Sequence, residues 1–146
     1  MEVTFIYPNQ LFEPHPAIIR GRAIFLIEDP LFFGDKKHII NYNKKKILLH
    51  HLSMSYFFKK LTGSGYNLKI IEYKDLLIED YTTSLIKDHQ ISKVHLVEIV
   101  DHELNNRINI ASKKTGSKIV YYKNPNFLLD GSDISEHFSN KKFYFM

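Results

Sequence analysis

Short runs of β-branched, aliphatic and aromatic residues recur along the chain, and each run has the length of a β-strand. The five runs are Val3–Tyr7, Ala23–Glu28, Leu68–Tyr73, Val94–Ile99 and Lys118–Tyr122. The run that begins at Ala23 is almost continuously apolar, which is typical of a strand covered on both faces in a parallel sheet. The pattern predicts five strands.

A segment with helical periodicity separates the second and third of these runs. Between Lys44 and Leu61 the apolar positions that predict one helix face, interrupted by His51, are Ile47, Leu48, Met54, Phe57, Phe58 and Leu61. The glycines of "TGSGY" follow this face, and Gly63 or Gly65 is available for a left-handed cap. The segment is therefore predicted to be a long helix that packs on the sheet.

Three further helices are predicted downstream. The first begins at Asp80 or Thr82 and runs through Gln90. Asp101 is expected to cap the next helix, which "KKTG" closes, and its inner face carries Leu104, Ile108 and Ala111. The last is a short helix from Ser132 to Phe138.

Strands that alternate with helices imply βαβ units with right-handed crossovers. We therefore predict an α/β fold, a Rossmann-like three-layer domain with a five-stranded parallel sheet. A chain of 146 residues suits one core, so residues 1–146 are expected to form a single domain. The longest irregular piece is expected from Asp29 to Asn43, and a loop of that length in a small domain is usually functional or mobile.

The composition narrows the possible functions. The formal net charge is +4, and the lysines are spread along the chain, whereas a dedicated DNA-binding module has a denser basic stripe. Direct nucleic-acid binding by these residues alone is therefore not favoured. The chain contains no cysteine, which excludes disulfides, thiolate metal sites and cysteine-held iron–sulfur clusters within it.

Neither a membrane span nor a secretion signal is visible in the sequence. No apolar run approaches the roughly 20 residues that a spanning helix needs. The start, "MEVTFIYP", reads as a strand and lacks the basic region and cleavage site of a signal peptide. We expect a cytoplasmic protein with no membrane partner, and a reducing compartment fits the lack of cysteine.

Two motifs are better explained by structure than by chemistry. His50 and His51 are adjacent, and adjacent side chains on a helix point about 100° apart, so they do not share one metal ion. The sequence Gly63-Ser64-Gly65 follows a helix and precedes a strand, the reverse of a phosphate-binding loop. No nucleophile elbow is recognisable, and we predict neither a metal site nor a catalytic residue.

Carboxylates and amides occur where the predicted strands end. Glu28 and Glu98 end or nearly end two strands, and Asn9 and Gln10 follow the first strand. Ligands of open α/β sheets bind beyond the carboxyl ends of the strands, where the strand order reverses. A carboxylate there accepts hydrogen bonds from a heterocycle, and an amide reads a ring edge. A solvated strand end is the alternative for Glu28 and Glu98, and it is favoured for Glu72.

Three lysines, Lys44 to Lys46, lie at the front of the long predicted helix, where cations oppose the helix dipole. Such a cluster is tolerated when it is solvated or when it faces an anion. A solvated cluster is the default interpretation, and contact with a polar or phosphorylated ligand tail is the alternative.

The block "LIEDPLFFGD" followed by "NKKKILLHHLSM" resembles the amino-terminal part of bacterial photolyase-related proteins, in the cryptochrome/photolyase superfamily. The family pattern H-K-x-K-L-x-L-H-R-x-S-M is matched at Lys44, Lys46, Leu49, His50, Ser53 and Met54. "YPNQL" is similar to the family's G-D-Q-L, and "VEIVDHEL" to its V-E-P segment. The chain departs from the pattern at Pro8-Asn9, Asn43, His51 and Ile99.

The resemblance implies a two-part flavoprotein. Its α/β domain holds an antenna chromophore of lumazine or deazaflavin type, and a larger helical domain holds FAD and a four-cysteine iron–sulfur cluster and contacts damaged DNA. That FAD-binding domain is absent from these residues, so photolyase activity is not expected from them alone. The cofactor-binding residues expected in this domain are Asn9, Gln10, Leu11, Glu28, Pro30, Lys44, Lys46 and Glu98.

Two other hypotheses stay open. The departures at Pro8, Asn9 and His51 favour a standalone Rossmann-like module that binds a nucleotide or a partner and has no photochemistry. A small enzyme acting at Glu28 and Glu98 is the weakest hypothesis, because no nucleophile–base pair can be named.

Overall fold

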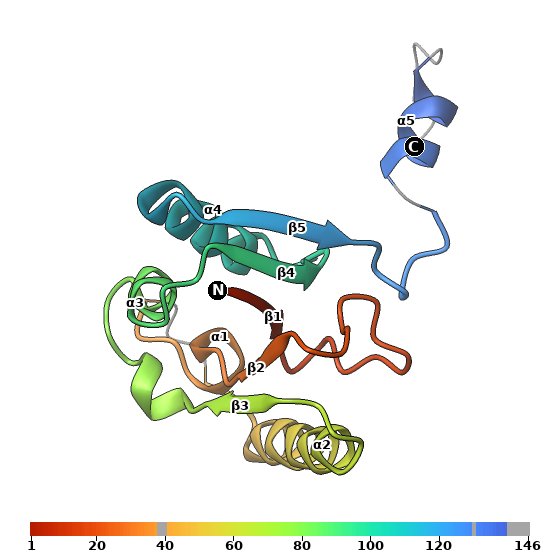
Figure 1. The fold of residues 1–146 in the computed structure, drawn as a ribbon. Helices are drawn as coiled ribbons and strands as arrows, with labels where there is room; N and C mark the ends of the chain where they lie inside the picture. Colours follow the sequence, from red (N-terminus) through yellow and green to blue (C-terminus); the bar gives the residue numbers. More distant parts are fainter. Residues whose placement is uncertain (38–40, 130, 140–146) are drawn as a thin grey trace.

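The structure is a computed structural model that describes residues 1–37, 41–129 and 131–139 (Figure 1). Its strands are β1 (Glu2–Ile6), β2 (Ala23–Ile27), β3 (Leu68–Ile71), β4 (Lys93–Val97) and β5 (Lys118–Tyr122). Its helices are α1 (Pro30–Phe33), α2 (Lys44–Gly63), the 3₁₀ turn η1 (Tyr73–Leu76), α3 (Tyr81–Asp88), α4 (His102–Thr115) and α5 (Gly131–Phe138).

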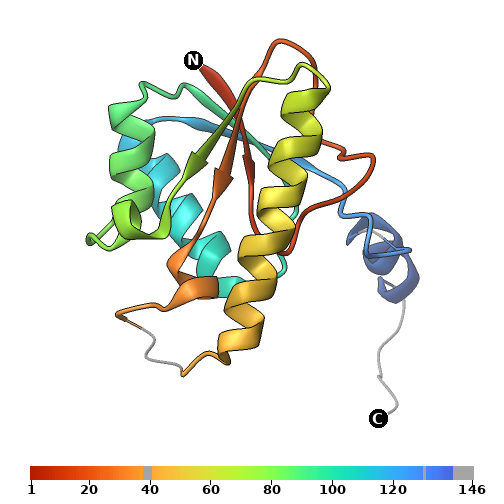
Figure 2. The same ribbon diagram turned by 90° about the horizontal axis from the view of Figure 1, so that it is seen from below.

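All five strands are parallel and lie in the order β3-β2-β1-β4-β5. Helix α2 covers one face of the sheet, and α3 and α4 cover the other (Figure 2). The predicted α/β fold with a five-stranded parallel sheet and three layers is therefore confirmed. The strand order reverses between β1 and β4, because the chain moves outward through β2 and β3 and returns to the other side of β1.

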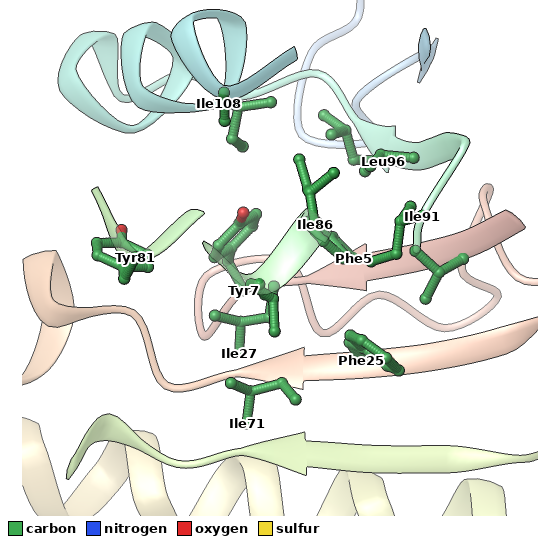
Figure 3. Packing of buried hydrophobic residues seen from close by; sticks show 14 of the residues in the cluster. Phe5, Tyr7, Phe25, Ile27, Ile71, Tyr81, Ile86, Ile91, Leu96 and Ile108 are labelled. Atoms are coloured by element: carbon green, nitrogen blue, oxygen red, sulfur yellow. The ribbon is translucent and has the colours of Figure 1, made fainter. Parts of the chain in front are cut away.

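The core has one apolar cluster on each face of the sheet. On the α3 and α4 side, Phe5 and Phe25 stack with ring centroids 6.0 Å apart, and Ile108 of α4 points toward the sheet (Figure 3). On the α2 side, Met54 and Phe57 pack against the strands with Ile6, Ile24 and Leu26. The remaining predicted inward residues of α2, which are Ile47, Phe58 and Leu61, are partly buried in the same cluster.

Polar caps fix the ends of the long helices. Asn43 accepts a hydrogen bond from the Lys45 amide at 2.9 Å and opens α2, and Asp101 accepts from the Leu104 amide at 2.9 Å and opens α4. Gly116 closes α4 in the left-handed conformation, with φ 74°. The predicted Asp101 cap is confirmed. Gly63 is the last residue of α2, and of Gly63 and Gly65 it is Gly65 that adopts positive φ.

The predicted boundaries need several corrections. Four strands end one or two residues earlier than predicted. At β1 the reason is that Tyr7 stays buried after the strand has ended. The segment from Asp29 to Asn43 contains α1, and its residues 38–40 lie outside the described residues. The longest irregular piece is instead the connection between β1 and β2. Leu48 was predicted on the inner face of α2 and is 57% exposed. None of the helices in the described ranges is long and apolar enough to cross a bilayer.

Candidate functional site

Gln10 joins the two strand ends at the point where the strand order reverses. This side chain is 2% exposed, and its Nε2 donates to the carbonyl oxygens of Val97 at 3.1 Å and Glu98 at 3.3 Å. It ties the loop after β1 to the end of β4. Its Oε1 is buried and has no hydrogen-bond partner within the described part of the chain. Gln10 therefore bridges two strand ends, and its binding of a ligand stays a prediction.

Glu28 is held by the protein on the α2 side of the sheet edge. Its Oε1 lies 2.9 Å from His51 Nδ1, and its Oε2 accepts from the Tyr73 amide at 3.0 Å. The His51 side chain, which interrupts the apolar face of the predicted helix, is 47% exposed. The imidazole of His51 lies at the sheet edge, where it pairs with the carboxylate of Glu28. His50 is the more enclosed ring, because Phe32 and Phe33 pack against it.

The other predicted binding residues are spread along this edge. Asn9 and Glu98 are exposed, Leu11 is half-buried in the cluster under α2, and Lys44 is exposed. Lys46 is also exposed, with its Nζ 5.6 Å from the centre of the Tyr42 ring. The structure brings Gln10 and Glu98 together. Within the described residues, no hydrogen bond or ion pair joins either of them to Glu28, Lys44 or Lys46.

A hollow of about 580 Å³ lies beside this edge, on the α3 and α4 side of the sheet. It is bounded by the segment after β2, the turn before α3 and one face of α4. The residues that line it are Pro30, Asp35, Lys36, Lys37, Leu76, Leu77, Ile78, Glu79, Asp80, Tyr81, Thr82, Glu103, Asn106, Arg107, Ile110 and Lys114. Its volume suits a small-molecule ligand, and of the predicted binding residues Pro30 is the one in its lining.

A smaller hollow of about 60 Å³ adjoins Glu98 and the segment after β5, with Asn124 and Leu128 among its lining residues. The Asn124 amide donates to the Glu98 carbonyl oxygen at 3.0 Å. This space has about one tenth of the volume of the larger hollow.

Arg107 organises the polar side of the larger hollow. Its guanidinium forms an ion pair with Asp35 and donates from Nε to Glu103 at 2.9 Å. It also lies over the Tyr81 ring, 5.9 Å from the ring centre. Burial by itself lowers the pKa of Arg107, but hydrogen bonds with Tyr81, Asp35 and Glu103 outweigh burial and raise it. The guanidinium is therefore a fixed cation between two carboxylates.

Asp29 extends this network into the interior. The side chain is 0% exposed, accepts from the Leu31 amide at 3.0 Å as the cap of α1, and accepts from the Tyr81 hydroxyl. Burial raises the pKa of Asp29 to about 6, against the opposing effects of the Tyr81 and Leu31 hydrogen bonds. The polar side of the hollow thus continues inward to a carboxyl group whose charge changes near neutral pH.

Sequence reasoning did not identify Asp29, Tyr81 or Arg107. The dipeptide Asp29-Pro30 after a strand is a signal for a capped helix with proline in its first turn. Glu103 and Arg107 stand four residues apart on a predicted helix, a spacing at which side chains of opposite charge meet. Nothing local marks Tyr81, because its partner Asp29 is 52 positions away.

Asp29 makes the stability of the protein depend on pH. Its pKa rises from 3.8 in the absence of perturbation to about 6 in the folded state, so the folded protein holds this proton more tightly than the unfolded chain does. The stabilisation that results is fully present below about pH 4 and is lost as the pH rises through about 6.

We expect the substitution Asp29→Asn to abolish this dependence. The variant keeps an oxygen that accepts from Leu31 but does not ionise. From about pH 4 to about pH 7 the wild type should lose on the order of 2–3 kcal/mol in its free energy of unfolding relative to the variant. Urea unfolding of both proteins across this range measures the difference. The buried His15, whose pKa burial lowers to about 4, titrates in both proteins and cancels. A difference that is constant with pH would contradict the prediction.

Comparison with known proteins places the chain in a family. A family model for deoxyribodipyrimidine photo-lyase-related proteins matches residues 4–146. An uncharacterized protein of Acanthamoeba polyphaga mimivirus is 28% identical over 152 residues, and the alignment covers 97% of this chain and 76% of that relative. The predicted resemblance is thereby confirmed across nearly the whole chain. The chain belongs to the deoxyribodipyrimidine photo-lyase-related protein family.

Proposed function

We propose that this chain is an antenna-type α/β domain, and that its larger hollow receives a flat chromophore of lumazine or deazaflavin type in support of light-driven DNA repair. The observation that carries the proposal is a hollow of about 580 Å³ beside the carboxyl edge of the sheet in a chain of this family. Open α/β sheets bind their ligands at that edge. When bound, such a chromophore absorbs near-ultraviolet or blue light and passes the excitation to a flavin.

The donor set of the hollow fits the edge of such a ring. A lumazine presents an imide, with one N–H between two carbonyl oxygens. The carboxylates of Asp35 and Glu103 accept from an N–H, and the guanidinium of Arg107 between them donates to a carbonyl oxygen. Leu77 and Ile110 supply apolar surface for the faces of the ring.

The charges around the hollow favour an uncharged ring over a phosphate. Lys37 lies 3.3 Å from Glu103, and Lys114 lies 2.7 Å from Asp80. Lys36 donates to the carbonyl oxygen of Leu77 at 3.0 Å. Because each of these cations already has an oxygen partner, an anion entering the hollow would compete with these protein contacts.

A binding titration with a lumazine tests this proposal. We expect saturable binding with a shift in the near-ultraviolet absorbance of the lumazine. Ile110→Trp, which fills the hollow from an exposed position on α4, should weaken binding at least about tenfold, since a ligand that loses its cavity loses about 1.4 kcal/mol or more. Ile19→Trp is the matched control, because Ile19 is 49% exposed, Ile110 is 40% exposed, and Ile19 lies outside the hollow.

The titration also separates the two candidate positions for the ring. If Asn9→Ala and Glu98→Ala weaken binding while Ile110→Trp does not, the chromophore lies at the strand ends that the sequence predicts. If the protein binds neither lumazine nor deazaflavin at micromolar concentration, the antenna role is excluded.

The proposal also covers a protein that carries a helical FAD domain. In such a protein, the helical domain would bind FAD, an iron–sulfur cluster and damaged DNA.

A second candidate function is a standalone module that kept the fold without the photochemistry. The observation that favours it is the viral relative, since the alignment to this chain takes up 76% of that protein. Most of the relative is thus this one domain. Micromolar binding of an adenine nucleotide, combined with no affinity for lumazines or flavins, would select this alternative.

A further inference from the structure

The outer face of α2 carries an apolar stripe that the fold leaves uncovered. The stripe consists of Leu48, Leu49, Leu52 and Tyr56, which are 57%, 63%, 60% and 65% exposed. Their spacing places them along one side of the helix, opposite Met54 and Phe57, which face the sheet. Contiguous exposed apolar surface of this kind marks an interaction site.

Positive charge surrounds this stripe. Helix α2 contains five lysines and no acidic residue. Lys45 precedes the stripe on the same side of the helix, and Lys59 follows it. Two copies of α2 packed on each other would set like charges together in either orientation. The partner that fits α2 is therefore an acidic segment with its own apolar side chains.

The chain contains such a segment after β5. Phe127, Leu128 and Leu129 are 55%, 103% and 62% exposed, and Ile134 in α5 is 47% exposed. Helix α5 buries none of its residues, and its sequence "GSDISEHF" includes two acidic residues and no lysine or arginine. This C-terminal segment, residues 127–138 apart from residue 130, is complementary to the α2 stripe in both apolarity and charge.

The two surfaces lie at opposite sides of one copy. The C-terminal segment leaves the body beyond β5, while α2 packs against β3 at the other edge of the sheet (Figure 1). Four strand spacings separate these edges, about 19 Å. A two-fold arrangement lets each copy place its segment on the other copy, and it makes the same contact twice.

We propose that the occupant of the α2 stripe is the C-terminal segment of a second copy of this chain, in a reciprocal dimer. In this dimer Phe127–Leu129 and Ile134 cover Leu48, Leu52 and Tyr56. Glu136 of α5 lies among the lysines of α2. The contact uses neither the hollow nor the chromophore, so it holds or fails independently of the proposed antenna function.

Sedimentation equilibrium of the full chain between about 1 and 100 µM tests the proposal. We expect a monomer–dimer equilibrium with a micromolar dissociation constant, which Leu52→Asp raises at least about tenfold. Ile78→Asp is the matched control, because Ile78 is 55% exposed and lies on the far side of the sheet. A monomer at all concentrations overturns the proposal, and so does a dimer that Leu52→Asp leaves unchanged.

A charge exchange identifies the segment that binds. Lys59→Glu and Glu136→Lys should each weaken the dimer, and the two together should restore a part of the loss. Because the chain has no cysteine, the pair Leu52→Cys and Ile134→Cys reports proximity without background. An oxidised dimer on a non-reducing gel supports the proposal. An oxidised monomer would show that the segment covers α2 of its own copy, and this result overturns the proposal. A monomer whose α2 stripe binds vesicles containing anionic lipid overturns it as well.

Discussion

Replacing Arg107 with methionine is expected to lower the free energy of unfolding by about 3–5 kcal/mol, the usual cost of removing one partner from a buried ion pair. Methionine keeps most of the volume of the arginine stem but removes the guanidinium that pairs with the carboxylate of Asp35, which is 9% exposed. It also removes the positive charge over the Tyr81 ring, which interacts favourably with the carboxylate of Asp29. Urea unfolding at neutral pH measures the loss.

Two further variants show whether the loss of stability comes from the ion pair between Arg107 and Asp35. Arg20→Met is the matched control, because Arg20 is exposed and lies over the Tyr66 ring, and we expect it to cost less than about 1 kcal/mol. Adding Asp35→Asn to Arg107→Met should recover part of the stability, since it removes the buried charge with which Arg107 pairs in the wild type. Equal costs for Arg107→Met and Arg20→Met would show that the network around the hollow does not stabilise the fold.

Replacing Phe5 with alanine is expected to cost about 3–5 kcal/mol, the range for a fully buried phenylalanine. Phe5 is 0% exposed, lies in the central strand β1 and stacks on Phe25. Removing the ring leaves a cavity between the sheet and the layer of α3 and α4, which neighbouring strands cannot close because their ladders fix their spacing.

Phe127→Ala is the matched control for the Phe5 variant. Phe127 is 55% exposed and lies beyond β5, so its truncation should change the stability of the monomer by less than about 0.5 kcal/mol. Thermal or urea unfolding of both variants, at a concentration where the protein is monomeric, provides the comparison. A Phe5→Ala variant as stable as wild type would contradict the packing described for the central strand.

The architecture could be predicted because it depends on local patterns. The strand Lys118–Tyr122 was predicted with its observed bounds, and the Asp101 cap was found from residue type and position alone. The other strands were extended one or two residues too far, and at β1 this happened because apolar burial continues past the end of the strand. Tyr7, for example, is 1% exposed and follows the end of β1.

The candidate site could be predicted only in part because its contacts join distant positions. Gln10 was placed at the correct edge of the sheet, but its hydrogen bonds to Val97 and Glu98 span 87 and 88 positions, and no local pattern reveals that it joins these strand ends. The pair of Asp35 and Arg107 spans 72 positions. Sequence patterns show which edge of the sheet carries polar groups, whereas side-chain packing decides where a hollow remains.

At the lysine cluster at the start of α2, too, the sequence predicted the helix but not the contacts of its side chains. Asn43 was named as a departure from the family pattern, and in the structure it supplies the oxygen that caps the helix. This cap satisfies the Lys45 amide, so the exposed lysines stand on a helix end that is already stabilised. The periodicity gave the inner face of α2 apart from Leu48, and the apolar stripe on its outer face became visible only from the exposure of its residues.

The most direct test of the account is an amide NMR titration of the uniformly ¹⁵N-labelled protein with a lumazine, because it locates the ligand residue by residue. Binding in the hollow predicts shifts that saturate together at Lys36, Tyr81 and Asn106, with little change at Asn9 and Glu98. Shifts confined to Asn9 and Glu98, or an unchanged spectrum at millimolar lumazine, would contradict the assignment of the hollow as the chromophore site.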